Sequence, residues 1–588
     1  MPPEQQEADI SPLPVTQVFC YKGPNLSRFD TSMTRHVVLS LFLTVLLAFP
    51  AAGNASVEEM FPLMGDQLRA KVENLNAIQN ATCRNEFIYS RNQLPRFYEI
   101  RGYRPAWLNE RGLIPQVDDL VRALHDASLE GLIPGNYHLA AIESLIGIIR
   151  DGEQEFQDTE QLTDLDILLT DAFFIYGATL SRGRVDPETL HVRRTARVNK
   201  VDFVTLVSEA IDGNTIATTL ESLKPPHPAY GRLKEGMTRY REIALTGGWG
   251  TVPEGPKLKK GDVSERVPPI RRHLVITGEL QDGDTGSPDL FDERLETAVM
   301  AYQARHGLDP DGVVGARTLA ALNETADALV RKIELNLERW RWLPRDLGKR
   351  YVLVNSAAFR LDVVEGGEEV MSMRVVVGRN YRSTPVVSSS IVYMVLNPYW
   401  NIPTKLAVED IAPQVLKNPQ YLAERKIHIF TDWRADALEV DQSEVNWKKY
   451  TAENFPYKLR QDPGPKNPLG RIKFIFPNIH DVYLHDTPER NLFYKASRGF
   501  SSGCIRIEKP YDLAMYLLRG DKEWTRQKLN AAIRSGEMTT VHLPKPVPVH
   551  LLYWTAWADE DGMVQFREDI YERDAPLYQV LMENPSMF

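Results

Sequence analysis

The spacing of apolar residues divides the chain into regions with different predicted secondary structure. Between about 80 and 250 the apolar residues recur at helical spacing, for example at Val117, Leu120 and Leu124. This pattern predicts an α-helical domain over 80–250. From about 350 the period changes to short β-branched and aromatic runs, which are typical of strands. We therefore expect a helical domain followed by a mostly β domain.

A smaller unit is predicted over 258–323. A stretch rich in Gly, Pro and Lys at 250–265 indicates a linker,. Beyond it, Asp292 can cap a helix with one apolar face, and Gly307 can end that helix. A turn and a second helix follow. These signals predict a small helical module.

The β-rich region is expected over 335–545, with a C-terminal extension over 546–588. The predicted strands are Tyr351–Val354, Phe359–Val364, Met371–Val377, Ile391–Leu396, Ile472–Phe476 and Val482–His485. A Glu-Gly-Gly-Glu turn at 365–368 joins the second and third of them as a hairpin. Residues 404–470 interrupt the strands with mixed helix and loop signals. An insertion of this length typically forms a lid or a binding element.

The first 55 residues predict an N-terminal extension and a signal peptide. A basic start at Met33-Thr-Arg35 precedes the apolar run Val37–Ala52, and small residues follow, with a cleavage site expected after Ala55,. Met33 is an alternative start. The apolar run is short for a membrane-spanning helix, which needs about 20 residues. An uncleaved anchor and a buried core helix are the two alternatives. We expect the rest of the chain to be exported.

Composition limits the function classes. The chain has 588 residues, 43% of them hydrophobic, which suits several globular domains,. Its formal net charge of −10 argues against a nucleic-acid partner, because such partners need clustered basic residues,. Three cysteines cannot form a disulfide framework in a chain of this length,. Cys20 lies in the signal region, so only Cys83 and Cys504 remain, and reactivity is the more plausible role for a cysteine that matters.

Cys504 and His485 form the strongest candidate catalytic pair. His485 ends one predicted strand, and Cys504 begins the next in a polar, glycine-containing turn. An imidazole that takes the thiol proton makes the sulfur a strong nucleophile. Its other nitrogen needs an acceptor, which the carbonyl or the carboxylate of Asp486 could supply. Gly503 lets the backbone approach a substrate, so the N–H groups of Ser502, Gly503 and Cys504 could bind an oxyanion.

The segment Ser501-Ser-Gly-Cys504-Ile-Arg506-Ile, with His485 upstream, resembles the signature of the L,D-transpeptidase family. Ser502 replaces the His of that family's Ser-His-Gly-Cys motif, but the family's general base is the upstream His, which matches His485. Further matches point to the large lid-bearing Gram-negative branch, and they are the segments 97–107, 397–403, 463–470, 473–478 and 552–557. The unit over 258–323 resembles the three-helix peptidoglycan-binding module.

The resemblance implies an α+β multidomain architecture. It comprises an α-helical scaffold domain (80–250), a peptidoglycan-binding module (258–323) and a mostly-β L,D-transpeptidase catalytic domain (335–545) whose lid is the insertion 404–470. The module could have kept its wall-binding role or could serve as a structural spacer. The resemblance also implies a periplasmic location, either free or anchored to the inner membrane by an uncleaved signal.

The chemistry implied by the resemblance is 3→3 peptidoglycan cross-linking. Cys504 would attack a tetrapeptide stem after its diamino acid, release D-Ala and form a thioester, which the side-chain amine of a second stem would resolve. His485 would accept the thiol proton and later protonate the leaving amine. The resemblance implies no cofactor and no metal. It implies carbapenem-type inhibitors that acylate Cys504, and other cell-wall enzymes are further candidate partners.

Four residues are candidates for substrate binding. Tyr483 and Trp400 could form walls for the stem peptide or could belong to the core. Arg506 could bind a carboxylate bidentately or could form a structural ion pair. Asp486 completes the set through its place beside His485.

Rival interpretations remain open at this point. The same thioester would serve an L,D-carboxypeptidase or a ligase that joins the wall to a lipoprotein, and a non-catalytic wall-binding scaffold is an alternative of another class. Gly499-Phe-Ser501-Ser-Gly503 satisfies the serine-hydrolase pattern, which requires a strand before the serine and a helix after it. His480 and His485 lack the further ligands of a metal site. A disulfide between Cys83 and Cys504 would disable the nucleophile, and we expect a free Cys504 thiol.

Overall fold

The computed structural model describes residues 57–78, 80–151, 158–187, 201–283, 287–434 and 436–582. All of them belong to the compact unit Ala55–Phe588. The expected signal peptide and its alternative start lie outside the described residues. None of the helices in these ranges combines the length and the apolar character that a bilayer-spanning segment requires.

The first region is mostly helical, as predicted. Its helices are α1 (Val57–Ala77), α2 (Leu94–Ile100), α3 (Gln116–His125), α4 (Leu139–Asp151), α5 (Thr159–Arg182), α6 (Phe203–Asp212), α7 (Ile216–Leu223) and α8 (Pro228–Leu245), and its short strands are β1 (Thr82–Cys83), β2 (Glu86–Phe87), β3 (Leu108–Asn109) and β4 (Gly112–Leu113). Helix α5 is buried on all sides from Leu162 to Leu180. A helix that is buried on every face is the centre of a bundle, and α1, α4 and α6 pack against α5.

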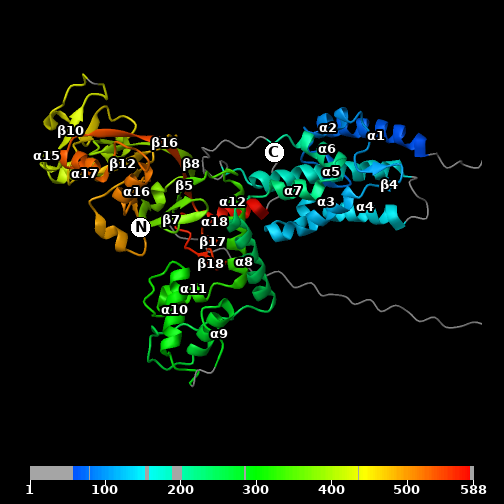
Figure 1. Ribbon diagram of the computed structural model, residues 1–588, viewed down its shortest axis with the longest axis horizontal. Coiled ribbons are helices and arrows are strands. Elements are labelled where there is room, and N and C mark those ends of the chain that lie inside the picture. Colours follow the sequence, from blue (N-terminus) through cyan, green and yellow to red (C-terminus); the bar gives the residue numbers. More distant parts are fainter. Residues whose placement is uncertain are drawn as a thin grey trace, which may run out of the picture. The chain divides into compact units, whose positions relative to one another are not determined.

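The small module follows as three helices, α9 (Val267–Thr277), α10 (Glu293–Arg305) and α11 (Ala316–Leu322), shown in green in Figure 1. The Asp292 carboxylate accepts a hydrogen bond of 2.8 Å from the Leu295 N–H and caps α10, as predicted,. Gly307 follows the helix with a φ of +68°, a left-handed conformation that favours glycine,. A separate apolar core holds the module together. Helix α12 (Ala326–Arg341) then leads to the β-rich domain.

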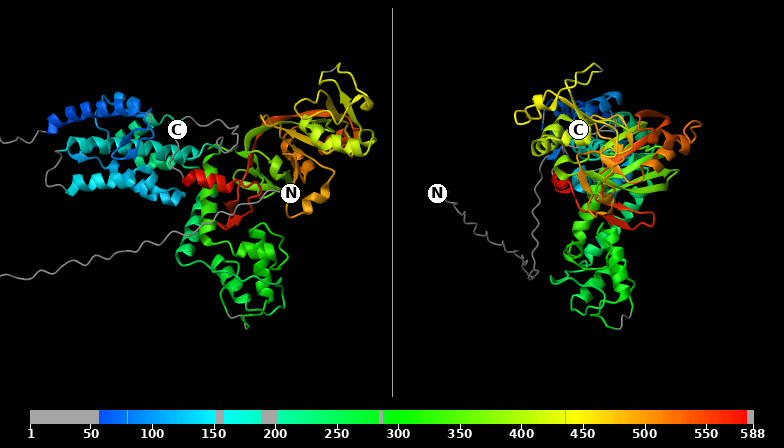
Figure 2. Two further views of the ribbon diagram at one scale, coloured as in Figure 1. Left: turned by 180° about the vertical axis from the view of Figure 1, so that it is seen from behind. Right: turned by 90° about the vertical axis from the view of Figure 1, so that its left-hand side faces the viewer.

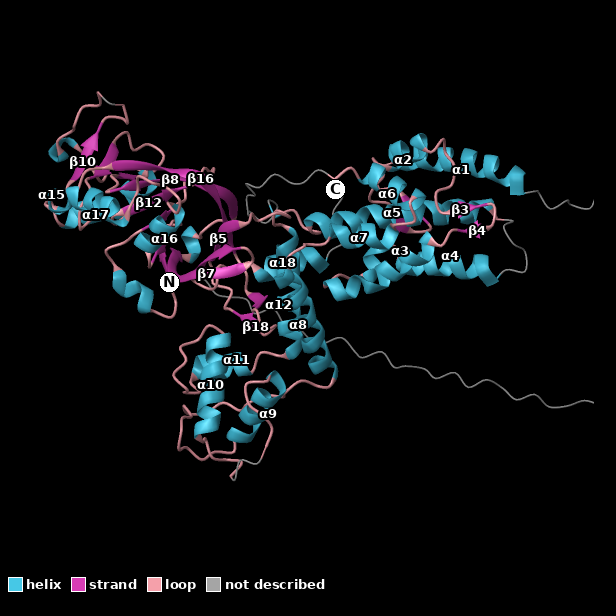
Figure 3. Cartoon of the chain, in the orientation of Figure 1, coloured by secondary structure: helices cyan, strands magenta, loops and turns pink. Residues whose placement is uncertain are grey.

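The β-rich domain is built on a nine-stranded mixed sheet, whose strands are magenta in Figure 3. Its strands are β5 (Arg350–Asn355), β6 (Arg360–Glu365), β7 (Glu368–Gly378), β8 (Val387–Leu396), β12 (Ile472–Ile475), β13 (Leu484–His485), β14 (Gly499–Ser501), β15 (Ile505–Ile507) and β16 (Thr539–Leu552). Their order is β14-β7-β15-β13-β12-β8-β16-β5-β6, and a further pairing of β6 with β7 closes the sheet on itself. The hairpin predicted at 365–368 joins β6 and β7.

One face of this sheet forms the domain core. Alternate residues of the strands, such as Val375 and Val377 of β7, are fully buried in a single apolar cluster,. Helices α16 (Pro510–Leu517) and α17 (Arg526–Ser535) contribute Leu513 and Leu529 to the same cluster. The opposite pleat of β12, β13 and β15 is therefore free to carry polar chemistry.

Strand β16 spans the domain boundary expected at residue 545. Its residues Val549–Leu552 pair in parallel with β5, so they belong to the nine-stranded sheet. Three prolines, at 544, 546 and 548, interrupt the strand, and its pairing with β8 shifts register between His542 and Val547,. The chain ends in β17 (Ala556–Ala558), β18 (Val564–Phe566) and α18 (Asp574–Met582).

The insertion between the strands is a small folded subdomain, shown in yellow in Figure 2. Its elements are β9 (Trp400–Ile402), which precedes it, α13 (Thr404–Leu406), a π-helical turn (Ala407–Ile411), α14 (Ala412–Lys417), α15 (Tyr421–Arg425), β10 (Ile427–Phe430) and β11 (Lys458–Gln461). The mixed helix and loop signals of this segment did not predict β10 and β11, which form a three-stranded sheet with β9. Each strand is only three or four residues long, which is too short for a clear alternation,.

Candidate active site

Strand register places the candidate residues on one face of the sheet. In the parallel pair β13–β15, Leu484 lies opposite Ile505 and His485 lies opposite Arg506. Leu484 and Ile505 point into the core. Since side chains alternate along a strand, Tyr483, His485, Cys504 and Arg506 share the opposite face. The sequence predicted that the chain returns beside His485 at Cys504. The pairing of β13 with β15, which directly follows Cys504, agrees with this prediction.

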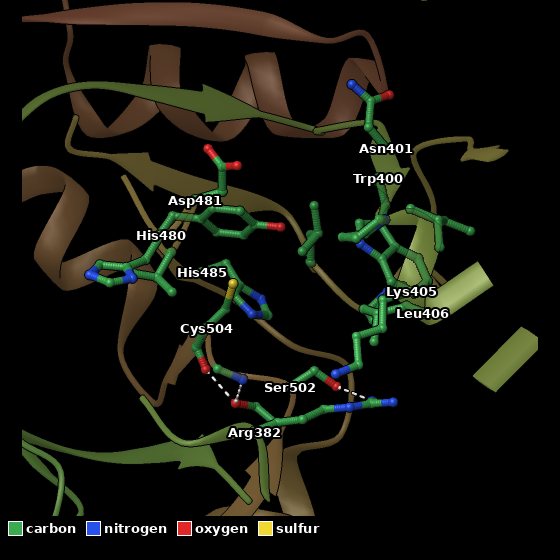
Figure 4. A pocket seen from close by; sticks show the side chains of 18 of the residues that line it. Arg382, Trp400, Asn401, Lys405, Leu406, His480, Asp481, His485, Ser502 and Cys504 are labelled. Carbon is green, nitrogen blue, oxygen red and sulfur yellow. Dashed lines mark hydrogen bonds between the residues drawn. The ribbon is translucent and has the colours of Figure 1, made fainter. Parts of the chain in front are cut away.

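This face forms the floor of a cavity of about 1090 Å³. Cys504 and His485 both line the cavity and both point into it (Figure 4). Residues of the insertion, including Lys405 and Leu406, line the other side. The cavity is large enough for a peptide substrate. It brings together the nucleophile and base that the sequence predicted.

The His485 imidazole is fixed by the backbone. Its Nδ1 lies 2.5 Å from the carbonyl oxygen of Asp486, one of the two acceptors that we expected. A carbonyl only accepts, so Nδ1 carries the proton and Nε2 keeps its lone pair. Burial, followed by the nearby cations Arg506 and Lys473, lowers the pKa of His485 to about 3,. The ring is therefore neutral near pH 7 and can accept a proton at Nε2.

The Cys504 thiol is protonated in the resting site. Burial raises its pKa above the ordinary value, although hydrogen bonding with Tyr483 and the charges of Lys473 and Arg506 act in the opposite direction,. The site thus contains a neutral thiol and a neutral imidazole rather than a preformed ion pair. Such a pair supports attack in which the proton moves as the sulfur bonds to carbon.

The loop before Cys504 has a defined hydrogen-bond pattern. The Ser501 Oγ donates to the Cys504 carbonyl oxygen at 2.5 Å and accepts from the Gly503 N–H at 3.1 Å. The predicted oxyanion donor Gly503 is thus engaged within the loop, which leaves the N–H groups of Ser502 and Cys504 as the remaining candidates. Gly503 has a φ of +114°, so this position favours glycine for its backbone conformation,.

The serine-hydrolase alternative lacks its structural context. Ser501 ends the three-residue strand β14, and the segment after it continues as strand β15 rather than as a helix,. Its hydroxyl is already hydrogen-bonded to the Cys504 carbonyl oxygen and the Gly503 N–H.

Within the described ranges, no group of three or more His, Cys, Asp or Glu side chains is arranged to hold a metal ion. Cys83 and Cys504 are both free thiols.

The four substrate-binding candidates differ in position. Tyr483, Trp400 and Arg506 line the cavity. Arg506 also forms an ion pair with Glu489, which is the structural alternative to carboxylate binding that the sequence offered. The carboxylate of Asp486 is turned elsewhere. It accepts a hydrogen bond of 2.8 Å from the Arg471 N–H and pairs with Arg490 at 3.3 Å, which makes it part of the framework beneath His485.

Arg382 and Lys473 are two of the cavity's cations that were not among the predicted site residues. Arg382 lies 2.9 Å from the Ser502 Oγ and forms ion pairs with Glu409 and Asp410 of the insertion, at 2.5 and 2.7 Å. These partners are far away in the sequence, so no local motif could have revealed them. The other cation is Lys473 of β12, which pairs in register with His485. It opens the segment 473–478, which resembles the large family branch, but nothing in that segment marked its side chain as part of the site.

A cysteine and a histidine thus line one cavity on a closed mixed sheet, and the folded insertion lines its other side. Residues 349–525 match the family model "L,D-transpeptidase catalytic domain", so this domain belongs to that family. Residues 92–237 match "Scaffold domain", and residues 265–322 match "Putative peptidoglycan binding domain". The chain is thus an α+β multidomain protein with an L,D-transpeptidase catalytic domain. Domains that act on the cell wall imply an extracytoplasmic location.

Two known proteins are similar to parts of this chain. A Haemophilus influenzae protein named "Putative L,D-transpeptidase" is 35% identical over 246 residues, which are 42% of this chain and 48% of that protein. The matched region therefore spans about half of that relative. The Mycobacterium tuberculosis protein "N-acetylmuramoyl-L-alanine amidase CwlM" is 40% identical over 80 residues, which are 12% of this chain and 20% of that protein.

A solved L,D-transpeptidase structure from Xylanimonas cellulosilytica also matches. It is 16% identical, and the match covers 51% of this chain and all of that chain with a TM-score of 0.17. A TM-score this low carries no structural argument, so the family assignment rests on the domain match and on the Haemophilus relative.

Proposed function

We propose that the chain is an L,D-transpeptidase that forms 3→3 cross-links in peptidoglycan through a thioester at Cys504. The observation that carries the proposal is the pairing of Cys504 with a neutral, backbone-anchored His485 in one cavity. The donor is a tetrapeptide stem, and the acceptor is the diamino acid of a second stem. Cofactors play no part in this scheme.

The first half-reaction forms the thioester. The Cys504 sulfur bonds to the carbonyl carbon of the donor's diamino acid while the thiol proton passes to the Nε2 of His485. The bond from that carbon to the D-Ala nitrogen then breaks, and the imidazolium returns the proton to the leaving amine. The backbone N–H groups of Ser502 and Cys504 stabilise the oxyanion that forms in between.

The second half-reaction forms the cross-link. The acceptor's side-chain amine attacks the thioester carbon, a new amide bond forms, and the carbon–sulfur bond breaks. The proton lost by the amine returns through His485 to the Cys504 sulfur. If water takes the place of the amine, the same intermediate gives carboxypeptidase activity, and a lipoprotein amine gives a wall-to-lipoprotein ligase.

The location and the inhibitor class belong to the same proposal. We place the mature chain in the periplasm, with or without an inner-membrane anchor, where the module binds the wall and other cell-wall enzymes are candidate partners. Tyr483 and Trp400 form the walls for the stem peptide. Carbapenems acylate Cys504, because a strained acyl donor reaches the same nucleophile.

Incubation with purified tetrapeptide stems tests the proposal. The unmodified chain is expected to release D-Ala and to produce dimeric stems, with one carbapenem adduct on Cys504 in the intact mass. Cys504→Ala is expected to lose all three. A chain that binds isolated cell walls but releases no D-Ala would support the non-catalytic scaffold instead.

A further inference from the structure

Lys473 lies beside the reacting groups without an acidic partner. It is half-buried in β12, opposite His485 in the β12–β13 pair, and it lines the cavity. Directly opposed residues place their Cβ atoms about 5 Å apart on the same face. The Lys473 ammonium lies 3.7 Å from the centre of the Tyr483 ring, and its charge acts on the Cys504 thiol. The cation is therefore a neighbour of both catalytic residues.

Three other cations of this cavity have carboxylate partners. Arg382 is paired with two carboxylates, Lys405 faces Glu409 at 3.9 Å, and Arg506 is paired with Glu489. Among the described residues, by contrast, no carboxylate lies within 4 Å of Lys473, and Asp481 acts on it only at longer range. Burial lowers the pKa of Lys473, and the nearby charges do not make up for the lost hydration.

An ammonium group in such a place has unused binding capacity. It carries three N–H donors, and the aromatic ring satisfies only one direction around it. A half-buried cation without a counter-ion is costly unless a ligand supplies the negative charge. Arg379 also lines the cavity without a carboxylate partner in the described ranges. It follows β7, however, and lies outside the β12–β13–β15 face that carries the reaction.

The geometry of the donor shows which anion would arrive there. In a tetrapeptide stem the attacked bond joins the diamino acid to a C-terminal D-Ala, whose carboxylate is free. That carboxylate carbon is three bonds from the attacked carbon and so lies about 4 Å from it. His485 must reach the leaving nitrogen, and Lys473 is the cross-strand neighbour of His485. The carboxylate of the leaving residue therefore lies within reach of Lys473.

We propose that Lys473 binds the free carboxylate of the leaving D-amino acid and thereby selects donors whose reacting residue is C-terminal. This inference rests on the proposed function and deepens it. Stems that are extended or capped beyond that residue lack the anion and lose the interaction. Lys473 acts as a specificity-determining residue, whereas Cys504 and His485 perform the bond chemistry.

The experiment compares two donors that differ in one group. One is a tetrapeptide stem with a free C-terminus, and the other is the same stem ending in a carboxamide. The measured quantity is the ratio of kcat/KM for release of D-Ala to kcat/KM for release of D-alaninamide. Any effect of a substitution on the thiol or on the fold changes both rates equally and cancels in the ratio.

Lys473→Met keeps the apolar stem of the side chain and removes its charge. Charge-assisted hydrogen bonds contribute strongly to binding, so we expect kcat/KM of the unmodified chain to be about 10- to 100-fold higher for the stem with the free C-terminus. Lys473→Met is expected to lose most of that preference. Lys473→Arg is expected to restore part of it. Lys528→Met, which removes an exposed lysine of α17 outside the cavity, is the matched control and keeps the full ratio.

Two results would overturn the inference. An unchanged ratio in Lys473→Met, or equal slowing of both donors, would mean that Lys473 acts on the thiol or on the fold and not on the leaving group. A chain that releases neither product and gives no carbapenem adduct would overturn the proposed function together with the inference. The carbapenem adduct thus separates failure of the inference from failure of the function.

Discussion

The two described cysteines lie in regions that give their thiols very different surroundings. Cys83 belongs to β1 of the scaffold region, is 6% exposed, and has its sulfur 3.3 Å from the Asp164 carboxylate. Cys504 opens into a cavity beside a neutral histidine. Burial raises the pKa of both thiols. A low resting pKa is therefore not what distinguishes Cys504, the proposed nucleophile, from Cys83.

The neighbours of the two thiols make the difference. At Cys83 the carboxylate of Asp164 disfavours a second negative charge, and this outweighs Lys71 and Arg84,. At Cys504 the nearby charges are the cations Lys473 and Arg506, which favour a thiolate as it forms. Access, a proton acceptor and positive charge thus set Cys504, the proposed nucleophile, apart from Cys83, and each can be tested separately.

The difference in solvent access between the two thiols is expected to give the largest effect, which is a difference in alkylation rate. When the native chain is treated with iodoacetamide, Cys504 should be alkylated at least about a thousandfold faster than Cys83, because Cys83 reacts only after local unfolding. Quantitative peptide mapping over time measures both rates in one sample. Denaturation in guanidinium is the control and should bring the two rates together. Comparable rates in the native chain would remove the contrast between the regions.

The proton acceptor comes next. His485→Gln keeps a polar side chain of similar size but cannot take the thiol proton, so thioester formation with a tetrapeptide stem should slow by about 100-fold or more. Burst release of D-Ala measures this step. His542→Gln, an exposed histidine in β16, is the matched control. Undiminished release in His485→Gln would show that another group acts as the base.

The pH dependence separates a neutral pair from a preformed ion pair. Because the pKa of Cys504 is raised, its thiolate fraction is still small near pH 8 and grows with rising pH,. Alkylation of Cys504 by iodoacetamide should therefore increase about tenfold per pH unit up to and beyond pH 8.5. The pKa of about 3 for His485 predicts no inflection between pH 5 and 7. A plateau below pH 8 would instead indicate a thiolate–imidazolium pair.

Loss of the contacts between Arg382 and the insertion is expected to have a smaller effect on activity. Arg382 joins Glu409 and Asp410 of the insertion to Ser502 beside the nucleophile. Arg382→Gln breaks these ion pairs, and we expect about tenfold lower kcat/KM for the tetrapeptide, together with faster proteolysis within 404–470.

A second arginine provides the control for this prediction. Arg434 belongs to the same insertion and pairs with Asp432, but its side chain is 74% exposed. Exposed pairs contribute little, so Arg434→Gln should leave both readouts unchanged. Equal effects of the two substitutions would mean that the insertion responds to any loss of charge rather than to loss of the link to Ser502.

The sequence was sufficient for features that depend on neighbours along the chain. Asp292 and Gly307 fix the ends of α10 through local hydrogen bonds and backbone conformation, and the turn at 365–368 forms its hairpin. The approach of Cys504 to His485 was also predictable, because His485 ends β13 and Cys504 directly precedes β15, the strand that pairs with it. In each case the physical cause lies within about twenty residues of the pattern that reveals it.

Features that depend on strand register or on long-range contacts were not predictable in this way. The partners of Arg382 come from the insertion and from the nucleophile loop, and no local pattern links them. The position of Lys473 beside His485 follows only from the β12–β13 register. Asp486 was expected near the substrate, but its carboxylate binds the Arg471 N–H and the Arg490 side chain, and no local pattern reveals these partners.

Cys83 itself should give the smallest effect. Cys83→Ser retains a donor toward Asp164 and removes little volume, so we expect release of D-Ala within about twofold of the unmodified chain and a loss of about 1–2 kcal/mol in stability of the scaffold region,. Thermal melting and the tetrapeptide assay on the same preparations measure both. The stability change should appear without a change in the acid-to-amide donor ratio, because Cys83 touches none of the groups that bind the donor. A Cys83→Ser chain that melts normally but loses activity would show that this buried thiol is coupled to the catalytic domain, and the contrast between an inert and a reactive cysteine would then fail.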